Sequence, residues 1–126
     1  MKRFLVSVVA VAAMLGLASN VSAFDINIDV APSVVSLDSQ GQVVTVHTDI
    51  AFGAVAGASV LLNEIPIAWW KSDNQGNFVA KFNLDDVKEM LKSRAGTEVV
   101  VTLTGETKDG EEFSGTDTIK VVRPRN

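Results

Sequence analysis

Apolar and polar residues alternate with a period of two through most of the chain after residue 24, and this pattern constrains the fold more than any other feature. Residues 24–30 (FDINIDV) show it first, and residues 41–50, 76–83 and 97–122 repeat it. Successive side chains of a strand point to opposite faces of a sheet, so each segment predicts a strand with one buried face. Several such strands, separated by turn residues at short intervals, predict an all-β sandwich.

Turn-forming residues mark the breaks between these strands. The run KDGE at residues 108–111 predicts a tight hairpin turn, since Asp-Gly supplies positive φ values. Residues 63–64 predict a break within the run 59–70 (SVLLNEIPIAWW), whose second strand is limited by Pro66. Residues 51–58 (AFGAVAGA) have little to bury and predict a loop.

One segment has a different period. The apolar residues of the run 83–96 (NLDDVKEMLKSRAG) recur at helical spacing, namely at Leu84, Val87 and Leu91. Asn83 is the expected N-cap, and Gly96 suits a left-handed C-terminal cap. The sequence therefore predicts about seven strands and one short helix, from Asn83 to Lys92, that crosses an end of the sandwich.

The apolar faces of these elements are expected to form one core. A chain of about 100 residues supports a single core, which predicts one domain over residues 24–126. The expected core residues are Ile26, Ile28, Val44, Val46, Leu61, Phe78, Phe82, Leu84, Val99, Val101, Leu103, Ile119 and Val121.

The first 23 residues predict a secretory signal peptide. Lys2 and Arg3 precede an apolar run over residues 4–18, and the small-residue pattern VSA follows at residues 21–23. The apolar run is short for a membrane span of about 20 residues. We therefore expect cleavage after Ala23, export to the periplasm or the extracellular space, and no stable membrane insertion afterwards.

The charge of the expected mature chain disfavours nucleic acid as a partner. Removing Lys2 and Arg3 from the 11 basic residues leaves nine against 15 acidic ones, a formal charge of −6. Binding to phosphates needs clustered Lys and Arg, which this chain lacks. It also has no cysteine, so its stability must come from packing and backbone hydrogen bonds rather than from disulfides.

Residues 71–82 (KSDNQGNFVAKF) are similar to a calcium-binding loop in composition. Asp73, Gln75 and Asn77 are the residues that would contact the ion. A calcium loop needs carboxylates at alternate positions and a glycine at the sixth, and no register satisfies both requirements here. We expect instead a hairpin turn, in which Asp73 caps its own backbone and Gly76 takes a positive φ, with no metal or other cofactor. Calcium is kept as the alternative.

Neither group of candidate catalytic residues predicts an enzyme. His47 is the only histidine, and Asp49 on the same strand face could orient it in a Ser-His-Asp arrangement, but a position in mid-strand offers no pocket. The acids expected at the last hairpin could act as paired carboxylates only if one were buried with a raised pKa. A solvated, charged hairpin end is the expected interpretation of these acids, which are Glu106, Asp109, Glu111 and Glu112.

Trp69 and Trp70 are the expected contacts for a ligand or a partner. They are adjacent on a predicted strand, so one indole is expected to be buried and the other exposed. An exposed tryptophan can stack on a sugar or anchor a protein partner. The alternative, which we favour, is that both indoles are half-covered, one in the core and the other under a loop or the helix. A second expected contact is the outer edge of the strand at residues 24–30, which could accept a strand from another chain.

Residues 99–122 (VVVTLTGETKDGEEFSGTDTIKVV) resemble a closing stretch, LTGET-DG--F-GTDTI-VV, of a β-sandwich module in exported, often multidomain bacterial and archaeal proteins. Residues 26–37, 60–63 and 78–91 are also similar to segments of that module. The resemblance implies an immunoglobulin-like sandwich that is accessory or adhesive rather than catalytic. The module commonly carries an acidic D-N-D-G type loop that could bind calcium, and this chain departs from it with DNQGN at residues 73–77.

These observations favour an exported, non-catalytic binding or structural module that contacts a protein or a cell-envelope surface. The alternative is a carbohydrate- or calcium-binding accessory domain.

Overall fold

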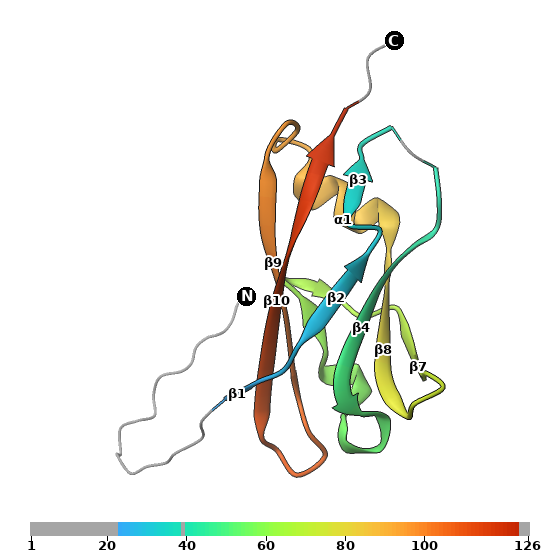
Figure 1. Cartoon of the computed structure of the whole chain (residues 1–126), viewed down its shortest axis with the longest axis vertical. Helices are drawn as coiled ribbons and strands as arrows, with labels where there is room; N and C mark the ends of the chain where they lie inside the picture. The colour runs from blue at the N-terminus through green and yellow to red at the C-terminus, as the bar shows by residue number, and fades with distance from the viewer. Residues whose placement is uncertain (1–22, 39, 124–126) are drawn as a thin grey trace.

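Two β-sheets and one α-helix make up the described part of the chain, residues 23–38 and 40–123, in the computed structural model (Figure 1). The elements are β1 (Phe24–Asp25), β2 (Ile28–Ala31), β3 (Val34–Ser36), β4 (Val43–Ala51), the 3-10 turns η2 (Phe52–Ala54) and η3 (Gly57–Ser59), β5 (Leu61–Leu62), β6 (Ile65–Pro66), β7 (Trp69–Ser72), β8 (Asn77–Asn83), α1 (Leu84–Leu91), β9 (Glu98–Glu106) and β10 (Glu112–Val122). The predicted signal peptide lies outside the described residues, except for Ala23. No helix in the described ranges is long and apolar enough to cross a membrane.

The sheets have different strand orders. Sheet A runs β1-β10-β9-β5-β6, with β3 also pairing with β10, and sheet B runs β2-β4-β8-β7. Neighbouring strands are antiparallel except β1 and β3, which run parallel to β10. The predicted mostly β fold with two sheets and one helix is therefore confirmed. The described residues form ten strands where about seven were expected, mainly because the N-terminal segment is divided.

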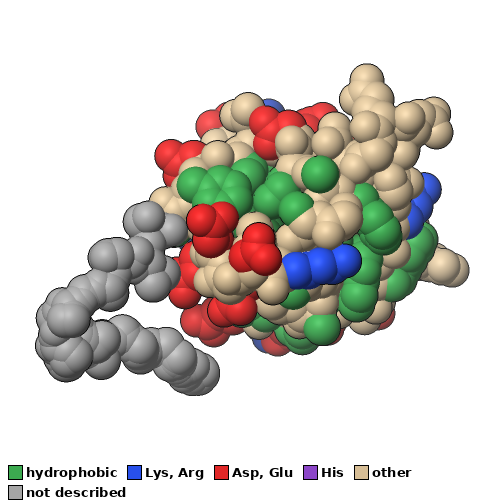
Figure 2. Space-filling view, turned by 90° about the horizontal axis from the view of Figure 1, so that it is seen from below, with side chains coloured by type: hydrophobic (Ala, Val, Ile, Leu, Met, Phe, Trp, Pro, Cys, Tyr) green, Lys and Arg blue, Asp and Glu red, His purple; other side chains and the backbone are tan. Residues whose placement is uncertain are grey.

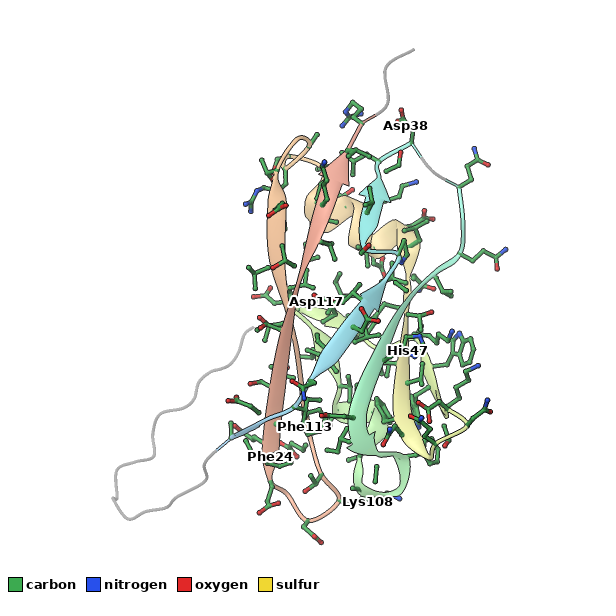
Figure 3. The ribbon with its side chains drawn as sticks, in the orientation of Figure 1. Phe24, Asp38, His47, Lys108, Phe113 and Asp117 are labelled. Carbon is green, nitrogen blue, oxygen red and sulfur yellow. The ribbon has the colours of Figure 1, made fainter. Side chains whose placement is uncertain are left out.

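The N-terminal segment is not the single strand that its alternation predicted. It pairs with β10 as β1, joins sheet B as β2 and returns to β10 as β3. Where it passes over β10, the Ile26 N–H donates to the Ser114 carbonyl at 2.8 Å. Farther along, the Val30 N–H donates to the Asp117 carboxylate of β10 at 2.8 Å, and Figure 3 shows Asp117 beside β2. The segment therefore ties the two sheets together at one side.

Gly115 allows this crossing. A Cβ atom at this position would lie 2.7 Å from the Ile26 carbonyl oxygen and 2.8 Å from a methyl of Ile28. Any side chain there would push the N-terminal segment away from β10, because both contacts are closer than non-bonded atoms tolerate. Glycine is required at this position by the close approach of another backbone.

The core lies between the sheets and contains most of the expected residues. Ten of the thirteen are buried, namely Val44, Val46, Phe78, Phe82, Leu84, Val99, Val101, Leu103, Ile119 and Val121. Ile26 and Ile28 are partly buried and pack against the core. The prediction for Leu61 is wrong: its side chain is 37% exposed, whereas that of Leu62 is 1% exposed. Consecutive residues of β5 face opposite sides of the sheet, and it is Leu62, the partner of Leu103, that faces inward.

Strand β4 follows its predicted alternation, with Val44, Val46, Thr48 and Ile50 all buried. Thr48 is polar, but its hydroxyl donates to the Phe78 carbonyl at 2.6 Å, which satisfies it inside the core. The register between β4 and β8 shifts between His47 and Ala51. Thr48 lies within this irregular stretch.

The predicted loop at residues 51–58 is largely correct but buries more than expected. It forms η2 and leads into η3, each a single 3-10 turn. Val55 in the middle of the run is 3% exposed and belongs to the core. The break at residues 63–64 is confirmed, and Asn63 there has a φ of 53°.

Helix α1 confirms the predicted helix to within one residue at each end. It packs on β8 and β4 at one end of the two sheets (Figure 1). Asn83 has the extended backbone of an N-cap, but its side chain makes no capping hydrogen bond. Gly96 has the expected positive φ, 85°, but it lies beyond the helix and donates its N–H to Val121. It therefore shapes the turn into β9 rather than the helix end.

The last hairpin has a longer turn than the sequence predicted. The final pair of the β9–β10 ladder is Glu106 with Glu112, which leaves five residues in the loop. Gly110 has a φ of 89°, as expected, while Asp109 has no positive φ. The Thr107 N–H donates to the Glu111 carbonyl at 2.8 Å and closes the loop.

Adjacent valines of β9 give a matched test of the core. Val101 is 0% exposed and Val100 is 60% exposed. Val101→Ala should lower the free energy of unfolding by about 1 to 3 kcal/mol, because it removes two buried methyl groups. Val100→Ala should change it by about 0.5 kcal/mol or less. Urea denaturation measures both, and equal losses would contradict the assignment of the inner face.

The crossing of the N-terminal segment can be tested at Gly115. Gly115→Ala should destabilise the fold by about 1 to 3 kcal/mol, since the added methyl would collide with backbone. Gly53→Ala is the control, because a Cβ at Gly53 would meet nothing within 4 Å. Thermal melts of the two variants should differ clearly, and an unperturbed Gly115→Ala would mean that the segment does not lie on β10.

Candidate binding surface on strand β7

Strand β7 lies at an edge of sheet B and is exposed along its whole length. Within residues 23–38 and 40–123 it pairs only with β8, and all four of its residues, Trp69–Ser72, are exposed. In Figure 1 it lies at the outer side of the molecule, beyond β8. An edge strand presents unpaired backbone groups as well as side chains to solvent. We call Trp69, Trp70, Lys71 and Lys81 the β7 surface.

Trp69 lies on the outer face of sheet B and is 47% exposed. The register places it beside Lys81 of β8, which in turn lies beside Thr45 of β4. The Lys81 ammonium is 5.4 Å from the centroid of the Trp69 ring, within reach of a cation–π interaction. The same ammonium donates to the Thr45 hydroxyl at 2.9 Å. Lys81 therefore holds the indole in place while leaving much of it in solvent.

Trp70 points to the opposite side of β7 and is 39% exposed. Its indole lies directly on the backbone of η3, since a Cβ at Gly57 would come within 2.2 Å of the ring. The expectation that one indole would be buried and the other exposed is wrong. The alternative is correct that both indoles are partly covered and that one of them, Trp70, lies against a loop, but wrong in placing the other in the core. The inner side of an edge strand opens partly to solvent, and η3 covers only part of the Trp70 ring.

A second cross-strand row lies next to Trp69 on the same outer face. It runs from Lys71 through Val79 and His47 to Asp29. Val79 is 0% exposed although it lies outside the core cluster. The outer face at β7 therefore combines an exposed indole, two lysines and a covered apolar residue. The two lysines were not among the predicted contacts. Lys71 shares the period of Trp69 along one strand, but the place of Lys81 beside Trp69 depends on the register between β7 and β8.

The loop with the composition of a calcium site is a hairpin turn, as predicted. The Asp73 carboxylate Oδ1 accepts the N–H groups of Gln75 at 2.8 Å and Asn77 at 2.9 Å. Gly76 has a φ of 83°. These bonds, that from Asn77 above all, and the charge of His47 lower the pKa of the Asp73 carboxyl. Gln75 and Asn77 take part in this turn through their backbone N–H groups, which donate to the Asp73 carboxylate.

Asp49 does not orient His47, although the two share a strand face. Its Oδ1 accepts the backbone N–H of Asn27 at 3.0 Å and its Oδ2 accepts the Asn27 side-chain amide at 2.8 Å. The bond from the Asn27 backbone, followed by that from its side chain, lowers the pKa of the Asp49 carboxyl. Both oxygens are thus engaged in fixing the N-terminal segment. His47, labelled in Figure 3, is exposed.

The four acids of the last hairpin, Glu106, Asp109, Glu111 and Glu112, are all exposed. Acidic side chains gather on this end of the molecule, which Figure 2 shows from below. An exposed carboxylate lacks the apolar surroundings that would raise its pKa for acid catalysis. The predicted charged, solvated end is confirmed. Among the described residues, no three His, Cys, Asp or Glu side chains are grouped so that they could hold a metal ion.

A depression of about 350 Å³ lies at the other end of the molecule, along α1. Its lining carries both signs of charge, from Asp85, Lys88, Glu89, Lys92 and Arg123. Lys92 and Glu89 form an exposed ion pair at 2.6 Å. Such a lining gives neither the net charge nor the apolar surface that a small-molecule site needs.

In comparisons with protein-family models, curated proteins and solved structures, nothing matches the chain.

Calcium addition tests the interpretation of the Asp73 loop. Millimolar calcium should leave the melting temperature unchanged. Asp73 supplies the one carboxylate of residues 71–82, and its Oδ1 already accepts two backbone N–H groups of the same turn. Magnesium at the same concentration is the control for ionic strength. A rise of several degrees with calcium alone, abolished in Asp73→Ala, would instead establish a metal site.

Proposed function

We propose that this protein is an exported, non-catalytic binding module with an immunoglobulin-like sandwich. Its β7 surface contacts a protein or another component of a cell-envelope surface. Export rests on the signal peptide that the first 23 residues predict.

The strand orders support the immunoglobulin-like assignment. Sheet B, in the order β2-β4-β8-β7, corresponds to strands A-B-E-D of such a sandwich. Strands β5, β9 and β10 of sheet A correspond to C, F and G in the same order. The resemblance of residues 99–122 to modules of this type agrees with that assignment.

One observation carries the binding proposal: an edge strand has all its residues exposed and two large indoles among them. Tryptophan is enriched among the residues that dominate binding energy at protein interfaces. Covering an exposed indole removes apolar surface from water, which stabilises a complex. Trp69 and Trp70 extend from the two sides of β7, so a partner that covers the strand would contact both.

The positions of the titratable groups support a non-catalytic role. Two carboxylates of sheet B and its hairpin, Asp49 and Asp73, accept hydrogen bonds from the protein's own amides. The Asp49 carboxylate is bonded to Asn27 and does not orient His47. The acids of the last hairpin are exposed to solvent. Asp49 and Asp73 therefore position the backbone of the fold rather than a reacting molecule.

Carbohydrate binding is the second candidate function. Trp69 presents a partly exposed ring with the Lys81 amine 5.4 Å from its centroid, and Lys71 follows two residues later on the same face of β7. An aromatic ring with donors at its side suits the apolar face and the hydroxyl groups of a sugar. Lys81 interacts with the Trp69 ring, so a sugar would have to use the ring surface that Lys81 leaves open. Calcium binding has less support, because Oδ1 of Asp73 is engaged.

Substitution of the indoles tests this proposal. The double variant Trp69→Ala, Trp70→Ala should keep its circular dichroism spectrum but lose at least about tenfold in binding to isolated cell envelopes, as measured by co-sedimentation. Leu61→Ala is the matched control, since it removes an exposed apolar side chain from the other sheet. Unchanged binding by the double variant would contradict the proposal, and retardation in polysaccharide gels that depends on Trp69 would favour the carbohydrate alternative.

A further inference from the structure

The sheet edges differ in how far they are open to another strand. The outer edge of β10 is occupied by β1 and β3. Strand β6 is two residues long and ends in Pro66, which has no N–H to donate. In β2, the Val30 N–H already donates to Asp117, so the N-terminal edge that the sequence suggested for strand addition is partly used. Strand β7 has none of these protections.

Alternation of the ladder shows which backbone groups of β7 are free. Asp73 donates its N–H to the Asn77 carbonyl at 2.9 Å. Hydrogen-bonded pairs recur at every second residue of an antiparallel ladder, so the pairs Lys71–Val79 and Trp69–Lys81 are also hydrogen-bonded. The N–H and C=O groups of Trp70 and Ser72 therefore point away from β8. They form two docking points for an added strand.

The charges beside these docking points favour a carboxylate on the incoming strand. Lys71 is the only charged residue of β7, and Lys81 lies diagonally across the same face. The nearby Asp73 carboxylate has Oδ1 turned to the amides of its own turn. A carboxylate opposite Lys71 would gain an attraction, whereas a lysine or arginine there would be repelled.

A second copy of this chain is a poor occupant. A two-fold pairing that joins Trp70 to Ser72 of the copy uses both docking points, but it places Lys71 directly against Lys71 of the copy. Shifting the register so that Trp70 faces Trp70 places Ser72 opposite Ala68. The Ala68 N–H is already donated to the Lys81 carbonyl at 2.8 Å, so each of the two outer pairs would lose one of its two hydrogen bonds.

We propose that β7 accepts an extended segment of another protein as a fifth strand of sheet B, with a carboxylate opposite Lys71 and an apolar side chain opposite Trp70. This proposal rests on the function proposed above and specifies its partner. Hydrogen bonds to Trp70 and Ser72 hold the segment, and its alternating side chains meet the outer and inner sides of β7. The recognised chemistry is an extended peptide that alternates acidic and apolar residues.

A synthetic peptide provides the test. The probe is a peptide of about eight residues that alternates glutamate with valine or threonine, the length needed to overlap β7 with flanking residues. Its binding should slow amide hydrogen exchange at Trp70 and Ser72, measured by NMR on the intact mature protein. The same peptide with N-methylated backbone positions should not bind, because it has lost the donors of the ladder.

Charge reversal at Lys71 distinguishes strand addition with a carboxylate opposite Lys71 from nonspecific peptide binding. Lys71→Glu should weaken binding of the glutamate peptide by about tenfold and favour a peptide in which lysine replaces glutamate. Lys108→Glu changes the net charge equally, on an exposed loop away from β7, and should have little effect. Equal losses in the two variants would overturn the assignment of Lys71.

Three further outcomes would overturn the proposal. Peptide binding without protection of the Trp70 and Ser72 amides would mean that only side chains are engaged. Protection of the same amides by self-association, at concentrations where the chain dimerises, would make a second copy the occupant. Envelope binding that depends on the indoles, together with no binding of any peptide, would reject strand addition while leaving the proposed function intact.

Discussion

Apolar contact between the two sheets is the interaction on which the rest of this structure depends. The chain has no cysteine, so no disulfide can link the sheets. Exposed ion pairs contribute little to the free energy of unfolding. Phe78 and Phe82 from sheet B and Leu103 and Phe113 from sheet A are fully or almost fully buried between them. The N-terminal segment adds polar bonds at one side of this core, and α1 covers one end.

Burial of the inner faces leaves the edges of the sheets as the variable part of the molecule. The N-terminal segment occupies the edge of β10 and extends sheet B by β2, which is possible because Gly115 has no side chain. On the opposite side of sheet B, no strand of the described residues pairs with the outer edge of β7. The proposed binding surface thus lies where the packing of the core ends. Its strand β7 is held in place by hydrogen bonds to β8, whose inner residues belong to the core.

The distribution of charge near β7 follows from local hydrogen bonding. The chain is acidic overall, yet Asp49 is committed to Asn27, and Asp73 to the amides of its turn. Lys71 and Lys81 remain beside the exposed Trp69. Carboxylates close to these lysines in the sequence therefore shape the backbone, whereas the amines lie on the outer face of sheet B.

The sequence by itself determined the elements and their inner faces, because both depend on local periodicity. The inner residues of β4, β8, β9 and β10, the limits of α1 and the turn at Asp73 all follow from it. Only the tertiary structure decided which strands became edges, how the N-terminal segment divided, and why Leu61 and both indoles are exposed. Period two assigns a side chain to a face, but the neighbours that cover that face come from pairings distant in the chain. Lys81 is one such neighbour, brought beside Trp69 by the register of β7 against β8. The turn η3, which covers part of Trp70, is another.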